Sequence, residues 1–245
     1  MIQRKNIFLE TSIICSVAIM IASINFLHGI NAIKTYAKDN NLVLGPEEVF
    51  NRVFINLDFV NIEYMEGNNP IHYTGPFIFF LATILIGSYT FLTLKKPYYQ
   101  FLFTRARTKQ YGVALILKGY FFRVTLFTGI YISGVILMIF HKNLSTLIES
   151  PTIIRQSIGF FLASTLISAG LTLTLYSLFT KFDEVKSIVV VLIILFITFG
   201  ANIQFPHLSI VFLGEDEYFK GGIFVGGILL FVSYFVSRVT KFEIK

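Results

Sequence analysis

The residues best suited to ionic chemistry lie in one stretch of the sequence, FLFTRARTKQYGVALILK, which covers residues 101–118. Its charged residues are all basic: Arg105, Arg107, Lys109 and Lys118. Basic groups at this density can pair with carboxylates of a partner protein. They can also simply hold a loop on the cytoplasmic side of a membrane. Both interpretations stay open on the residues alone.

A second group of polar residues could form a mildly polar groove for an amphipathic substrate. Ser164, Ser168 and Thr172 are spaced i, i+4, i+8, so they share one face of a helix. Three amide residues near the outer ends of their segments could extend this groove: Asn25, Asn202 and Gln204. The alternative is that these small and hydroxyl residues serve helix packing alone.

Helix packing is the expected role of two glycines near the C-terminus. Gly222 and Gly226 have the G-x-x-x-G spacing, and Gly221 and Gly227 double it. Glycines at this spacing place two bare backbone positions on one helix face, so that a neighbouring helix can approach closely.

Other kinds of reactive site are not indicated. The sequence contains no G-x-S-x-G, H-E-x-x-H or G-x-x-x-x-G-K-[ST] motif, so we expect no enzyme activity and no cofactor on this chain. His207 and the acidic residues 215–217 lack a diagnostic metal-ligand spacing, and we expect no metal site. The acidic Glu10 and the basic Arg123 flank long uncharged stretches at their inner ends, where pairing or snorkelling accommodates them.

The composition indicates an integral membrane protein. Of the 245 residues, 55% are hydrophobic, 16% are aromatic and only 14% are charged. Soluble domains have roughly 25% charged residues. The net charge of +6 would permit binding to nucleic acid, but its distribution follows membrane topology, and we expect no nucleic-acid partner. The single cysteine, Cys15, excludes an intramolecular disulfide.

Six stretches poor in charge are long enough to cross a bilayer, since a membrane-spanning helix needs about 17–25 residues. The fold class is therefore all-α: a polytopic membrane protein with six transmembrane helices in a single domain, residues 1–245. We expect the first apolar run to remain as a span rather than to be cleaved. The expected spans are about 7–28, 76–94, 120–140, 157–180, 187–204 and 221–238.

The distribution of charge predicts the orientation of these spans. With the N-terminus inside, 14 of the 20 lysines and arginines fall on the cytoplasmic side, whereas ten of the 14 acidic residues fall outside. Both termini are therefore predicted to be cytoplasmic, with a cytoplasmic loop at 95–118 and an outer loop at 29–75. Within the outer loop, Pro46 and the two glutamates after it predict a helix start. The apolar residues 208–213 predict a short helix that lies at the outer membrane interface or dips into it.

The sequence resembles the permease subunit of type-2 ABC exporters. Six spans, cytoplasmic termini, the lack of an ATPase motif and the basic loop after the second span carry the likeness. In that family the loop often has an aromatic or aliphatic pair, Thr-Arg, a hydroxyl residue before a basic one, an aromatic residue and a lysine. The matching positions here are Phe101–Leu102, Thr104–Arg105, Thr108–Lys109, Tyr111 and Lys118. The apolar segment before the sixth span is a second similarity, while the short N-terminal segment and the long first outer loop differ from the family pattern.

The resemblance implies a coupling helix in the loop 95–118 that docks on a separate ABC ATP-binding subunit. It further implies ATP and magnesium on that partner, assembly as a homodimer or with a sister permease, and a setting in membrane lipid, here a bacterial plasma membrane. The substrate it implies is amphipathic, for example a bacteriocin-like or antimicrobial peptide, or else a lipid-like or drug-like molecule. The residues assigned to contact with the ATPase are Phe101, Phe103, Thr104, Arg105, Arg107, Lys109 and Tyr111.

Two functions of other classes fit the same sequence. One is a non-transporting accessory or immunity protein that binds a peptide at the outer loop. The other is a membrane-embedded enzyme with no recognisable motif.

Overall fold

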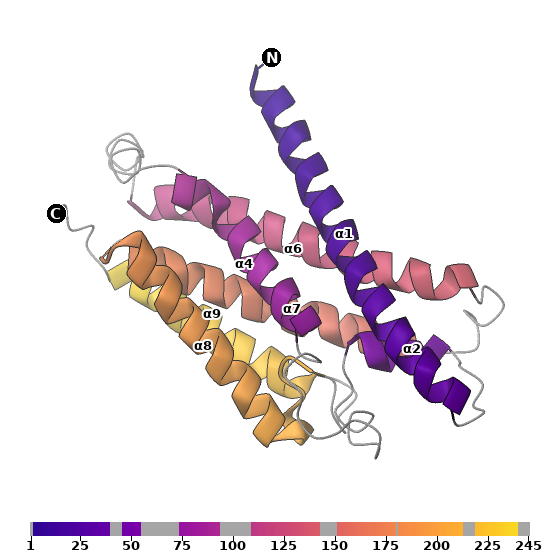
Figure 1. The fold of residues 1–245 in the computed structure, drawn as a ribbon. Coiled ribbons are helices and arrows are strands. Elements are labelled where there is room, and N and C mark those ends of the chain that lie inside the picture. Colours follow the sequence, from indigo (N-terminus) through magenta and orange to yellow (C-terminus); the bar gives the residue numbers. More distant parts are fainter. Residues whose placement is uncertain are drawn as a thin grey trace.

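The computed structural model describes residues 2–39, 46–54, 74–93, 109–142, 151–179, 181–212 and 219–239, and these residues form helices and short connections without a strand (Figure 1). The elements in chain order are α1 (Ile2–Asp39), α2 (Pro46–Val53), α4 (Thr74–Thr93), α6 (Lys109–Lys142), α7 (Pro151–Phe179), α8 (Glu184–Gln204), the 3₁₀ turn η3 (Pro206–Leu208) and α9 (Lys220–Val239).

The helices are those of a multi-pass membrane protein. Five of them, within the described residues, contain stretches long and apolar enough to span a bilayer: α1, α6, α7, α8 and α9. Helix α4 has 20 residues, and its apolar stretch, Thr74–Tyr89, is shorter. It occupies the place of the second predicted span and packs against both α6 and α7.

Two helices extend well beyond their predicted spans. Helix α1 has 38 residues and α6 has 34, which at 1.5 Å per residue gives lengths of about 57 and 51 Å. The hydrocarbon core is only about 30 Å thick. No proline interrupts either segment, so each helix continues into the polar flanks. Residues 29–39, expected at the start of the outer loop, and 109–118, expected in the cytoplasmic loop, are therefore helical.

Helix α7 lies at the centre of the bundle. It packs against α4, α6, α8 and α9, and α1 crosses α6 on the side away from α8 and α9 (Figure 1). Its membrane-length stretch is 67% buried, compared with 22% for that of α9. The exposed faces of α8 and α9 carry large apolar side chains, which suits contact with lipid.

Helices α7 and α9 pack closely through glycines of α9. A β-carbon added at Gly222 would lie 2.8 Å from Cβ of Ala163, and one at Gly226 would lie 2.7 Å from the backbone nitrogen of Ile167. Real β-carbons do not approach other atoms this closely, so only glycine permits the observed separation. Both glycines therefore lie at a close helix–helix contact, where the G-x-x-x-G spacing placed them.

Helix α2 begins at Pro46, as the sequence predicted, and covers part of the bundle core. It packs on α1 and α6, and its apolar face is buried. Phe54, directly after α2, lies 4.7 Å between ring centroids from Phe160 and 6.1 Å from Tyr131. This part of the predicted outer loop thus belongs to the protein interior.

The predicted interfacial helix at 208–213 was wrong in its described part. Only Pro206–Leu208 form a 3₁₀ turn, and Ile210, Val211 and Phe212 are buried within the protein rather than laid on the membrane surface. The ring of Phe212 packs edge-on against Phe199 of α8, with centroids 4.9 Å apart. The apolar run is therefore explained by core packing. Residue 213 lies outside the described residues.

The glycine contact between α7 and α9 gives a matched test. Gly226→Ala should lower the free energy of unfolding by about 1–3 kcal/mol, because the added methyl group overpacks the contact with Ile167. The measurement is the midpoint of detergent-induced unfolding. Gly227→Ala is the control, since a β-carbon there meets nothing within 4 Å. Equal effects of the two substitutions would contradict the close-contact interpretation.

Candidate functional site

An ion pair joins α1 to α6 near one end of the bundle. Arg123 Nε donates a hydrogen bond to Oε1 of Glu10. The side chain of Arg123 is 16% exposed and that of Glu10 is 34% exposed. Both residues lie inside the membrane-length apolar stretches Phe8–Asn31 and Leu117–His141. Of the two arrangements that the sequence allowed for these charges, the structure shows the paired one.

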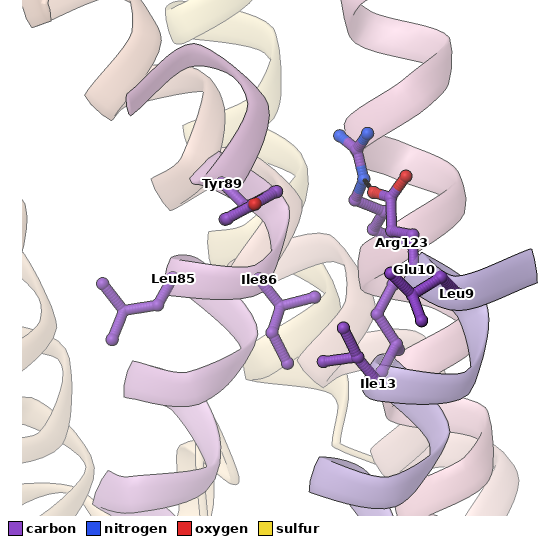
Figure 2. A pocket seen from close by; sticks show the side chains of 8 residues that line it. Leu9, Glu10, Ile13, Leu85, Ile86, Tyr89 and Arg123 are labelled. Atoms are coloured by element: carbon purple, nitrogen blue, oxygen red, sulfur yellow. Dashed lines mark hydrogen bonds and ion pairs between the residues drawn. The ribbon is translucent and has the colours of Figure 1, made fainter. Parts of the chain in front are cut away.

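A cavity of about 530 Å³ lies beside this ion pair (Figure 2). Figure 2 shows Ile86 and Tyr89 of α4 on one side of the space, and the ion pair with Ile13 on the other. The cavity combines apolar walls with two charges of opposite sign, and for this reason we treat it as the candidate functional site. Its lining residues are Leu9, Glu10, Ile13, Ile14, Leu85, Ile86, Tyr89 and Arg123.

Asn25, predicted for a substrate path, lies in a buried joint of three helices. Its Nδ2 donates to the carbonyl oxygen of Gly75 at 3.1 Å and to the hydroxyl oxygen of Tyr131 at 2.9 Å. The amide thereby links α1 to α4 and α6. Such bonds satisfy a polar group that would be costly to leave unpaired in an apolar setting.

The hydroxyl residues predicted for the same path are buried on α7. Ser164 donates back to the carbonyl oxygen of Phe160 at 2.5 Å. The hydroxyls of Ser168 and Thr172 are buried and have no hydrogen-bond partner among the described residues. The same is true of Thr165 on α7, and of Thr125 and Thr128 on α6.

An aromatic cluster separates Asn25 from these hydroxyls. Tyr131, which accepts the bond from Asn25, packs on Phe79 with ring centroids 4.4 Å apart. Phe79 in turn lies 5.7 Å from Phe160, one helical turn before Ser164. Aromatic side chains therefore connect the position of Asn25 to the start of the hydroxyl face of α7.

Asn202 holds the chain that follows α8. Its Oδ1 accepts hydrogen bonds from the backbone nitrogens of Val211 at 2.6 Å and Phe212 at 2.8 Å. Asn202 is fully buried, whereas Gln204, two residues further along, is exposed. The amide of Asn202 therefore fixes the fold of residues 205–212, a role that its place in the sequence did not reveal.

The residues assigned to an ATPase contact fall mostly beyond the described ranges. Phe101, Phe103, Thr104, Arg105 and Arg107 lie outside the described residues. The backbone of the other two, Lys109 and Tyr111, forms the first turn of α6.

The sequence did not reveal the burial of Arg52. From the sequence, Arg52 is assigned only to the outer loop as one of its basic residues. In the structure Arg52 lies on α2 and is 6% exposed, and this burial lowers the pKa of its guanidinium. The apolar residues Val49, Phe50 and Val53 around it were the available signal, because they give α2 a face that packs on the bundle. The cavity beside Glu10 was missed because its walls come from three separate helices.

No protein-family model, curated protein or solved structure matches this chain.

The two hydrogen bonds to Asn202 can be tested directly. Asn202→Ala should destabilise the protein by about 1–3 kcal/mol, because two buried backbone N–H groups lose their acceptor. The measurement is the midpoint of detergent-induced unfolding. Gln204→Ala, an exposed amide on the same helix, serves as the control and should leave the midpoint unchanged. A stable Asn202→Ala variant would show that this amide does not hold residues 211 and 212.

Proposed function

We propose that this chain is the transmembrane subunit of a type-2 ABC exporter, which moves an amphipathic substrate, such as an antimicrobial or bacteriocin-like peptide, out of a bacterial cell. ATP is hydrolysed on a separate subunit that binds the basic segment 101–118. The observation that carries the proposal is the continuity of α6, which begins inside this segment and continues without a break to Lys142.

Helix α6 is longer than a membrane span and extends beyond its apolar stretch at the N-terminal end. Its 34 residues measure about 51 Å, which exceeds the hydrocarbon thickness of about 30 Å. The apolar stretch begins at Leu117, so the turns from Lys109 project beyond it. Beyond those turns α6 packs on α1, α2, α4 and α7. A displacement of its first turn by an ATPase subunit would thus reach four other helices as a rigid-body movement.

The buried path residues fit a closed state of such an exporter. Ser168 and Thr172 are fully buried, so a substrate can meet them only after helices separate. ATP-driven closure of the partner subunits would shift the population toward the separated arrangement. A second copy of this chain, or a sister permease, supplies the other half of the pathway.

The proposal includes six spans with both termini in the cytoplasm. Helix α4 is the second span, which its 20 residues allow when residues 90–93 are counted. In this orientation the ion pair of Glu10 and Arg123 lies toward the cytoplasmic side, and α2 lies toward the outer side.

Reversing the charge of the coupling segment tests the function. The double substitution Arg105→Glu and Arg107→Glu should reduce substrate-stimulated ATPase activity at least about tenfold, since removing one charge-assisted hydrogen bond weakens partner binding by about 1.5–3 kcal/mol. Co-purification of the ATP-binding subunit with tagged full-length protein gives the second readout.

The matched control is the double substitution Lys34→Glu and Lys38→Glu, which reverses two exposed charges near the C-terminal end of α1. This pair should leave coupling intact. Absence of any nucleotide-binding partner would favour an accessory or immunity protein. Normal coupling in the 105/107 variant would return these charges to a purely topological role.

Cysteine labelling tests the orientation. In a Cys15→Ser background, Lys34→Cys should react with a membrane-impermeant maleimide in intact cells, because the outer end of α1 faces the medium. Lys186→Cys, in the exposed first turn of α8, should react only after permeabilisation. The reverse pattern would place the basic segment outside the cell and overturn the proposal.

A further inference from the structure

We propose that the cavity beside Glu10 and Arg123 binds a zwitterionic phospholipid with a primary ammonium headgroup, phosphatidylethanolamine. The phosphate would bind Arg123, the ammonium would bind Glu10, and an acyl chain would lie along the apolar walls. The inference requires only that the chain lies in a membrane, and it does not depend on the exporter function.

Both members of the ion pair have further hydrogen-bonding atoms that the pair itself does not use. Arg123 uses only Nε in its bond to Glu10, so its two terminal NH₂ groups have no partner among the described residues. Figure 2 shows these nitrogens pointing away from Glu10. Glu10 uses Oε1, and its Oε2 likewise has no partner among the described residues. The guanidinium fork suits a phosphate group, and the remaining carboxylate oxygen can accept a hydrogen bond from an ammonium.

The charge of the site favours a ligand without net charge. Glu10 and Arg123 sum to zero, so an anionic lipid would place a negative headgroup next to the Glu10 carboxylate. Phosphatidylethanolamine is neutral overall and carries one charge of each sign, so its phosphate can face Arg123 while its ammonium faces Glu10. Its ammonium can donate hydrogen bonds to Oε2, whereas the quaternary ammonium of phosphatidylcholine has no N–H to donate. The geometry therefore selects both the net charge and the type of amine.

The walls of the cavity fit an acyl chain that enters from the bilayer. Leu9, Ile13, Leu85 and Tyr89 are all more than 40% exposed, so the cavity is open at its side. Its volume of about 530 Å³ is within the range of about 300–1,000 Å³ found for ligand pockets. It holds part of a lipid, while the rest of the molecule remains in the surrounding membrane.

The ion pair also lies near the end of the membrane-length apolar stretches, where a lipid headgroup would be. Glu10 is close to Phe8, where the apolar stretch of α1 begins, and Arg123 follows the start of the α6 stretch at Leu117 by six residues, about 9 Å. An arginine at this depth can extend its head toward the interface while its stem stays in apolar surroundings. A phosphate at the membrane surface is thus within the reach of Arg123.

Native mass spectrometry of the full chain in detergent tests the proposal, with phosphatidylethanolamine, phosphatidylcholine and phosphatidylglycerol as competing probes. We expect the wild-type protein to retain phosphatidylethanolamine preferentially. Arg123→Gln should lower its occupancy about tenfold, as expected when a charge-assisted hydrogen bond is removed. Glu10→Gln leaves a net positive site and should shift the preference toward phosphatidylglycerol. Arg155→Gln, at an exposed arginine of α7, is the control and should change nothing.

A second variant distinguishes loss of the lipid site from loss of the fold. Ile13→Trp fills the cavity without altering either charge, and it should also lower phosphatidylethanolamine retention. Equal retention of the three lipids by the wild type, or unchanged retention in both folded Arg123→Gln and Ile13→Trp proteins, would overturn the proposal. Displacement of the lipid by free phosphoethanolamine at equal concentration would assign the site to a soluble ligand instead. Displacement by an amphipathic Leu–Lys peptide would assign it to a peptide.

Discussion

An amide or a charged group left without a partner in apolar surroundings is costly, and this constraint helps determine how the helices meet. Asn25 bonds to Gly75 and to Tyr131, which are 50 and 106 residues away in the chain. Glu10 pairs with Arg123, 113 residues away. Asn202 supplies the acceptor for the chain after α8. Each of these contacts fixes the position of one segment relative to another, which uniform apolar packing alone does not do.

Helix α6 takes part in two of these contacts. It carries Arg123, which binds α1, and Tyr131, which receives the bond from Asn25 and packs in the aromatic cluster. It also begins within the basic segment. The same helix thus joins the region proposed to bind an ATPase to the cavity proposed to bind lipid. A lipid at Arg123 would lie where the ion pair joins α1 to α6.

Most of the helices were predictable because length and hydropathy determine them locally. The helix start at Pro46 and the close contact at Gly222 and Gly226 were predictable for the same reason, since each depends on residues near in sequence. The cavity beside Glu10 and the burial of Arg52 were not, because they arise from the meeting of separate elements. Residues 208–212 were misjudged because an apolar run looks the same whether it is covered by lipid or by protein.

The glycine contact between α7 and α9 has a consequence for the mechanics of the bundle. At these glycines the backbones of α7 and α9 leave no space for a side chain between them, so the two helices pack directly on each other. Helix α7 also packs against α6, and both of these helices carry buried hydroxyls without partners in the described part of the chain. Water that reached those hydroxyls would satisfy them, so hydration would offset part of the cost of separating α6 and α7 from their neighbours. At Gly222 and Gly226, by contrast, the contact of α7 with α9 leaves no space even for a methyl group.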